Sequence, residues 1–165
     1  MERKPSGKAK LTLPSDTEIL IVRDFKGRAD LVFDAWCKPD WISEWYGCVE
    51  QKLTVCEMDF CEGGAWRWAL RDANGFEHAF SGNYRVIDRP NKLVFSERYE
   101  AIPGSDHITA LTFEERAGVT TMSMRIVHET KEARDGHLKA GMEWGIQDSL
   151  DRVEDLVTRA SLKAS

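Results

Sequence analysis

The sequence has no long hydrophobic run and no excess of positive charge. None of its apolar stretches approaches the roughly 20 residues that a membrane-spanning helix needs, and no secretory leader pattern follows the first ten residues. The net charge is −5 at pH 7. These absences argue against membrane insertion and against nucleic acid as a partner. They make a cytoplasmic location the expectation.

Cysteine and histidine are few, and their spacing fits no familiar metal or redox motif. The cysteines Cys37, Cys48, Cys56 and Cys61 contain no C-x-x-C pair, so buried reduced thiols are expected. The sequence also has no H-x-x-x-H pair, no G-x-S-x-G elbow, and no phosphate or dinucleotide loop. We therefore expect neither a metal nor a cofactor.

The length of 165 residues favours a single domain. Residues 1–16 carry several basic side chains without apolar periodicity, which predicts a disordered basic tail. The domain itself is expected over residues 17–162.

Two short helices are predicted early in this domain. Thr17–Phe25 has the branched apolar residues of a strand, and the aromatic-rich stretch Leu31–Gly47 follows it with helical spacing. Pro39 divides this stretch, because proline is poorly tolerated inside a helix. We expect Pro39 to end the first helix and Asp40 to cap the second.

A run of strands occupies the middle of the chain, where apolar and polar residues alternate. Short connections rich in Gly, Asp, Asn and Pro favour an antiparallel meander. The predicted strands are Cys48–Glu57, Ala65–Asp72, Phe76–Asp88, Lys92–Glu100, His107–Glu115 and Thr120–His128.

The last block, Thr130–Leu162, has the three-to-four spacing of an amphipathic helix. Gly136, Gly141 and Gly145 lie in its first half, and each would weaken a continuous helix. Either they mark a short separate turn before a main helix that starts near Leu138, or they leave room beneath the helix for a ligand or a close strand.

Five segments follow one another along the chain: "VFDAWCKPDWISEWYG", "MDFCEGGAWRW", "GNYRVIDRPNKLVFSERY", "LTFEERAGVTTMSM" and "GMEWGIQDSLDRVEDLV". They resemble the domain related to the activator of the heat shock protein 90 ATPase, within the START-like superfamily that also holds polyketide cyclases and lipid-transfer domains. The resemblance covers Thr17–Leu162 and implies an α+β helix-grip fold, in which a curved antiparallel sheet surrounds a long C-terminal helix and leaves a cavity. Full-length eukaryotic activators have a further domain ahead of this one, where the present sequence has only residues 1–16. A co-chaperone role is therefore not the leading expectation.

The leading functional hypothesis is non-catalytic: the protein binds or carries a small, mostly apolar or aromatic molecule in that cavity. Strand alternation and the glycine-rich half of the helix predict a pocket of roughly 300–1,000 Å³. Its expected lining is Trp45, Trp68, Phe80, Tyr84, Phe95, Tyr99, Met122, Met124, Met142 and Gly145.

Two other functions remain open. A cyclase- or hydrolase-like enzyme would need an acid or base in the cavity, for which Glu97 and His128 are the candidates. Glu97 either faces inward or reaches solvent or an arginine such as Arg85 or Arg98. His128 is expected to be exposed or to cap a strand end. His78 and His107 are expected at the rim. A chaperone-associated or regulatory interaction module, acting through a chaperone contact or as a homodimer, is the third hypothesis.

Overall fold

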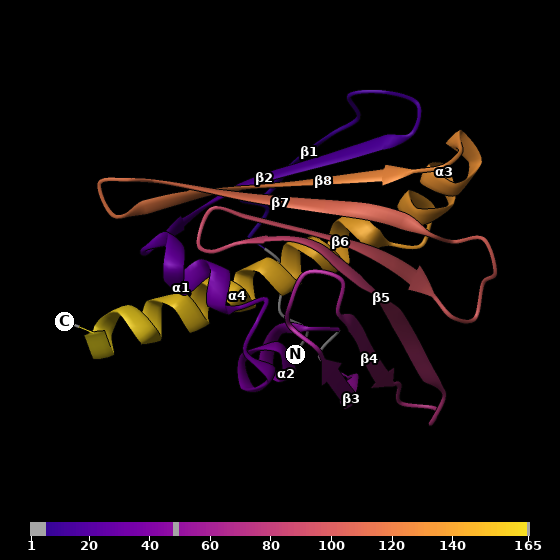
Figure 1. Ribbon diagram of the computed structural model, residues 1–165, viewed down its shortest axis with the longest axis horizontal. Coiled ribbons are helices and arrows are strands. Elements are labelled where there is room, and N and C mark those ends of the chain that lie inside the picture. The colour runs from indigo at the N-terminus through magenta and orange to yellow at the C-terminus, as the bar shows by residue number, and fades with distance from the viewer. Residues whose placement is uncertain (1–5, 48–49, 165) are drawn as a thin grey trace.

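The strands and helices of the computed structural model follow the predicted order, and one sheet packs against a long final helix (Figure 1). The structure describes residues 6–47 and 50–164. The strands are β1 (Lys10–Thr12), β2 (Glu18–Lys26), β3 (Lys52–Met58), β4 (Ala65–Arg71), β5 (Glu77–Asp88), β6 (Lys92–Tyr99), β7 (His107–Arg116) and β8 (Val119–His128). The helices are α1 (Ala29–Asp34), α2 (Pro39–Trp45), α3 (Lys131–Lys139) and α4 (Met142–Ala164).

All eight strands form one antiparallel sheet in the order β1-β2-β8-β7-β6-β5-β4-β3. The strands from β3 to β8 make the predicted meander, and β2 joins its far edge beside β8. Tight turns fix these connections. Between β4 and β5, for example, the Asp72 carboxylate accepts hydrogen bonds from the backbone N–H groups of Asn74 and Phe76.

The hydrophobic core lies between the sheet and α4. Ile21, Leu111 and Met122 are buried on neighbouring strands, and Leu150 and Val153 are buried on the helix. Figure 1 shows α4 running along one face of the sheet, with α1 and α2 beside it. Among the described helices, none is both long enough and apolar enough to cross a bilayer. The helix-grip architecture predicted from the sequence is confirmed.

The final helical block is divided at Gly141. Its φ of +79° is a left-handed conformation that ends α3, and α4 begins at the next residue. The separate α3 extends to Lys139, and the main helix starts at Met142, a few residues after the expected start near Leu138. An ideal Cβ on Gly136 or on Gly145 would have no heavy atom within 4 Å.

Pro39 begins α2 and does not directly end α1, which corrects the sequence prediction. The helix α1 ends at Asp34, and Lys38 is the N-cap of α2 without a side-chain capping bond, so Asp40 is not the cap. Proline suits the first turn of a helix because its missing N–H would have no intrahelical partner there. Cys48 and Val49, the start of a predicted strand, lie outside the described residues, and β3 begins at Lys52.

The segment before β2 also differs from the predicted disordered tail. Lys10–Thr12 forms β1 against β2. The side-chain amide of Gln147 both accepts a hydrogen bond from the Ala9 N–H and donates one to the Ala9 carbonyl. The Asp151 carboxylate accepts hydrogen bonds from the backbone N–H and the hydroxyl of Ser6. Polar side chains of α4 therefore hold residues 6–9, although these residues lack apolar periodicity.

Candidate functional site

A row of aromatic rings lies on the face of the sheet that packs toward α4. The register places Trp68 opposite Phe80 and Phe80 opposite Tyr99, so three strands present rings on the same face. The rings of Phe80 and Tyr99 are stacked with centroids 5.0 Å apart. The pairing of Tyr84 with Phe95 extends the aromatic surface along the same two strands.

The helix α2 and the residue that caps its C-terminus add two more rings to this surface. Trp45 is buried and donates its indole N–H to the Ala35 carbonyl at 2.6 Å. The Tyr46 ring meets Trp68 edge-to-face at 4.9 Å and Phe80 at 6.1 Å. The aromatic stretch Leu31–Gly47 therefore contributes both to the hydrophobic core and to the edge of the aromatic row.

The residues predicted to line a pocket divide into two groups by burial. Trp45, Trp68, Tyr84, Met122 and Met124 are buried. The others keep part of their surface accessible: Phe80, Phe95, Tyr99, Met142 and Gly145. The accessible part of the inner face therefore lies near the start of β5, along the second half of β6 and at the first turns of α4.

The aromatic side chains leave little empty space among themselves. The cavity lined by Trp36, Trp66, Trp68, Tyr84, Leu93 and Phe95 measures about 10 Å³, far below the predicted 300–1,000 Å³. Edge-to-face packing explains the difference, since rings such as Phe60 and Tyr84 meet with centroids 4.9 Å apart. Two polar atoms at this small cavity, Trp68 Nε1 and Tyr84 Oη, are buried without a hydrogen-bond partner among the described residues.

A larger hollow of about 500 Å³ is mainly polar. Its lining includes Arg67, Ser81 and Arg98, which face away from Trp68 and Phe80 because they alternate with them along the strands. Arg67 pairs with Glu100, and Arg98 pairs with Asp106. These ion pairs engage both arginines of the hollow.

Glu97 lies on the inner face, as the alternation indicates, and its partner is a histidine. Glu97 is directly opposite His107 in the ladder, and Glu97 Oε2 is 2.9 Å from His107 Nε2. The alternative that Glu97 pairs with Arg98 is wrong. Burial acts to lower the pKa of His107, but the hydrogen bond and the negative charge of Glu97 outweigh it, so the net shift is upward.

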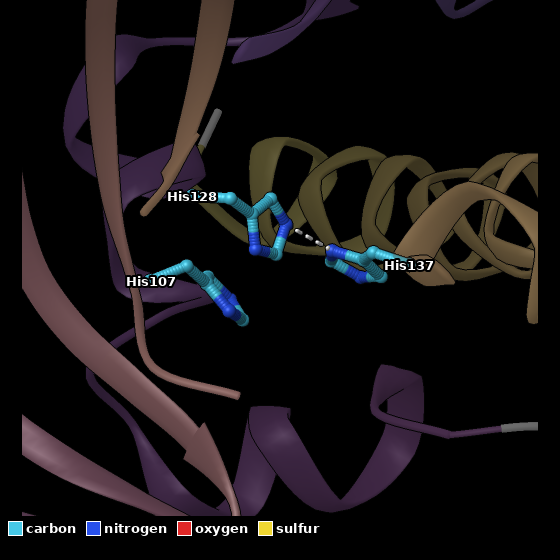
Figure 2. Close-up of side chains that lie close together, drawn as sticks. All are labelled: His107, His128 and His137. Atoms are coloured by element: carbon cyan, nitrogen blue, oxygen red, sulfur yellow. Dashed lines mark hydrogen bonds between the residues drawn. The ribbon is translucent and has the colours of Figure 1, made fainter. Parts of the chain in front are cut away.

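Two further histidines complete a cluster at this end of the sheet (Figure 2). His128 is directly opposite His107 on the next strand, and its Nε2 is 3.0 Å from Nδ1 of His137 on α3. The ring centroids of the three histidines are 4.7–5.2 Å apart. Burial, and then the positive charge of His107, lowers the pKa of His128 and of His137 to about 4. Both rings are therefore neutral at pH 7.

The structure changes the interpretation of His128 and adds a histidine to the candidates. His128 is only 5% exposed, so the prediction of an exposed or capping residue is wrong. His78 is half-buried and contacts Asp72 and Tyr99, away from the cluster. His137 was not a candidate, because motif spacing along one segment cannot detect histidines on separate elements. One signal was available: aligning the strands through their short turns would place Glu97, His107 and His128 in one row.

Together, the curved antiparallel sheet, the two short helices after β2 and the long final helix define a START-like helix-grip domain. Residues 26–158 match the family described as "Activator of Hsp90 ATPase homolog 1-like protein". The chain belongs to this family, as the resemblance in the sequence implied. No curated protein matches the chain at the significance required.

Solved structures support the same fold. A protein from Rhodobacter sphaeroides has 20% identity and a TM-score of 0.86, with 92% of this chain and 99% of that chain covered. A protein from Nitrosomonas europaea has 18% identity and a TM-score of 0.81, covering 93% and 100%. An AHSA1-like protein from Aeromonas hydrophila has 19% identity and a TM-score of 0.67, covering 87% and 94%. At these identities the likeness extends to the fold alone.

Proposed function

We propose that this protein binds a small, mostly apolar molecule against the inner face of the sheet and carries it without chemical change. The observation that carries this proposal is the row of half-buried rings formed by Tyr46, Phe80 and Tyr99 beside the buried Trp68. Half-buried aromatic rings offer apolar area that a guest can remove from water. The helix-grip fold supports the proposal, because its START-like relatives include lipid-transfer domains.

The helix side of this face can accommodate a guest. Met142 and Gly145 are half-buried, and a Cβ on Gly145 would have no heavy atom within 4 Å. Methionine adapts its shape easily, since its side chain is unbranched and flexible. On this proposal the half-buried rings turn aside as the guest enters, because the inner cavity is too small to hold it, and the buried core stays in place.

The polar atoms around the row define the guest further. Glu97 lies between Phe95 and Tyr99 on the same face of β6, and its negative charge contributes to raising the pKa of Tyr46, after the larger effect of burial. Trp68 Nε1 and Tyr84 Oη have no partner among the described residues. We therefore expect a guest with an aromatic or aliphatic body and one or two hydrogen-bonding groups.

Filling the space beside Gly145 tests the proposal. The variant Gly145→Leu should bind an environment-sensitive hydrophobic dye at least about tenfold more weakly than the parent, because the new side chain occupies the site of the guest. Gly136→Leu is the matched control, since Gly136 is also open but lies exposed on α3. Leucine favours a helix more than glycine does, so both variants should fold. Equal dye binding by the two folded variants would refute the proposed location.

Acid–base catalysis is the second candidate function, and the Glu97–His107 pair favours it. A carboxylate 2.9 Å from an imidazole beside an apolar surface resembles the arrangement of a general base and its orienting group. Under this hypothesis Glu97→Gln would abolish turnover of a bound compound and leave its binding within about threefold of the parent value. A chaperone-associated or homodimeric interaction module stays a prediction.

A further inference from the structure

We infer that His107, His128 and His137 form a binding site for a divalent transition-metal ion of the zinc type, with Glu97 as the carboxylate of the site. The donor atoms of the three histidines all lie within 4.8 Å of one another. Figure 2 shows the three rings gathered at one end of the sheet, with His137 reaching toward His128 from α3. Metal binding at this cluster requires no apolar guest, so it stands independently of the proposed function.

The geometry of the two nearest nitrogens is close to what zinc requires. Tetrahedral zinc with Zn–N bonds of about 2.0–2.1 Å holds its ligand nitrogens roughly 3.3 Å apart. His128 Nε2 and His137 Nδ1 are already 3.0 Å apart, joined by a hydrogen bond whose proton a metal ion would replace. The donor atom of His107 needs a movement on the order of 1.5 Å to reach the same spacing, which a side-chain rotation can supply.

The backbone holds these ligands in place before any metal arrives. Glu97, His107 and His128 are directly opposite one another on three adjacent strands. His137 comes from α3, whose start is fixed by the Thr130 hydroxyl accepting a hydrogen bond from the Ala133 N–H at 3.1 Å. Ligands on strands and a capped helix are more precisely placed than ligands on loops.

Glu97 supplies the negative charge that a cation needs. Its carboxylate lies 2.9 Å from His107 Nε2, and the carbonyl of Ser105 lies 3.2 Å from His107 Nδ1. Metal-binding histidines commonly have their second nitrogen hydrogen-bonded to a carboxylate or a carbonyl in this way. Binding replaces one of the two His107 hydrogen bonds and keeps the other, so Glu97 acts either as a fourth ligand or as the orienting group.

Packing in a hydrophobic core does not by itself explain why three histidines lie together here. His128 is 5% exposed, and its Nδ1 is buried without a hydrogen-bond partner among the described residues. Buried polar atoms are normally paired, and an unpaired one destabilises the fold. The unpaired nitrogen means that the described residues do not fully satisfy the cluster by themselves.

The donor set selects the class of metal. Three imidazoles suit zinc, copper, nickel and ferrous iron, whereas calcium and magnesium prefer oxygen ligands. The cluster contains no cysteine. Zinc is the appropriate first probe because it accepts imidazole and carboxylate ligands in a tetrahedral site.

The experiment measures zinc binding by the full chain after treatment with a chelator and buffer exchange. Titration against a chromophoric zinc indicator should show one tight site per chain. His137→Ala should weaken it by more than about 100-fold, and Glu97→Gln by about 10–100-fold, as is typical for groups around a metal. His78→Ala is the matched control, because His78 is half-buried on the same sheet but outside the cluster, and it should bind like the parent.

Cobalt substitution distinguishes the histidine site from binding by thiols. Co²⁺ should give visible ligand-field bands of nitrogen and oxygen coordination, without the charge-transfer band of a thiolate. His137→Asn is the second variant if His137→Ala does not fold, and thermal unfolding monitors both. Equal zinc affinity in a folded His137 variant and in His78→Ala would overturn the inference. A thiolate band that accounts for all bound cobalt, or a parent protein without a tight site, would do so as well.

Discussion

Arg23 of β2 and Asp151 of α4 form a buried ion pair, with Nη1 and Oδ1 2.6 Å apart. The side chain of Arg23 has no accessible surface, and that of Asp151 is 4% exposed. Arg23 also pairs with Glu154, one turn further along the helix, and Asp151 also accepts the hydrogen bonds of Ser6. The sheet, the long helix and the N-terminal segment are therefore joined at one carboxylate.

Removing the charge of Asp151 should be strongly destabilising. We expect Asp151→Asn to lower the free energy of unfolding by about 3 kcal/mol, because loss of one partner leaves a buried guanidinium incompletely paired. Urea unfolding followed by circular dichroism measures this change. The control Glu143→Gln removes an exposed carboxylate from the same helix and should change stability by less than about 0.5 kcal/mol. Similar losses in the two variants would contradict the prediction.

The contribution of Asp151 should also depend on pH. Burial acts to raise its pKa, but hydrogen bonds from Ser6 and the pairing with Arg23 outweigh it, so the folded-state pKa is below the ordinary 3.8. The stabilisation is therefore complete above the unfolded-state pKa and is lost as the pH falls through the folded-state pKa.

The difference in stability between the parent and Asp151→Asn is the measurement, since other carboxylates of the chain also titrate in acid. It should stay constant from neutral pH to about pH 5 and then narrow. A difference that widened in acid would show that the pKa of Asp151 is raised by folding.

The cysteine thiols should differ in reactivity. Burial, reinforced by the negative charge of Asp34, raises the pKa of Cys37 to about 11. Cys61 is exposed, so an alkylating reagent can reach it. At pH 8 we expect iodoacetamide to modify Cys61 well before Cys37, because the thiolate is the reacting form. Peptide mapping by mass spectrometry measures both rates, and faster modification of Cys37 would refute this ordering.

A side chain at Gly82 should lower the stability of the fold, whereas a side chain at Gly136 should not. A Cβ on Gly82 would lie 1.8 Å from the Ser96 carbonyl oxygen and 2.9 Å from Trp66 Nε1. Gly82→Ala should therefore cost about 1–3 kcal/mol of stability, through displacement of β6. Gly136→Ala should be neutral or should stabilise by up to about 1 kcal/mol, because its Cβ meets open space within a helix. Equal effects of the two substitutions would contradict the close approach of Gly82 to the Ser96 carbonyl.

The sequence indicated the strands more accurately than the site. Alternation along β4 and β6 places Trp68 and Glu97 on the inner face, and the structure agrees. Strand periodicity reports burial directly, so it determines which face a residue occupies. It does not report how closely the rings pack, and the cavity among the rings around Trp68 and Tyr84 measures only about 10 Å³.

The histidine cluster depends on information that no single segment carries. His137 meets His128 because the chain turns back after β8 into α3, whose start is capped by Thr130. The N-terminal segment was likewise misread, since its partners Gln147 and Asp151 lie more than a hundred residues away. Both contacts join separate elements of the fold, so the local composition of a segment does not predict them.

The dense packing of indoles also determines how this protein interacts with light. Trp66 and Trp68 have ring centroids 5.0 Å apart at 55°, and Trp36 and Trp45 are 5.1 Å apart at 52°. Tilted chromophores at such distances share their electronic excitation, so they produce paired bands of opposite sign in circular dichroism and pass absorbed energy among themselves. Trp144 is 47% exposed at the start of α4 and is the indole that a dissolved quencher reaches most directly. Emission from the buried group and emission from Trp144 therefore give two separate optical signals, one from the packed interior and one from the helix end beside Gly145.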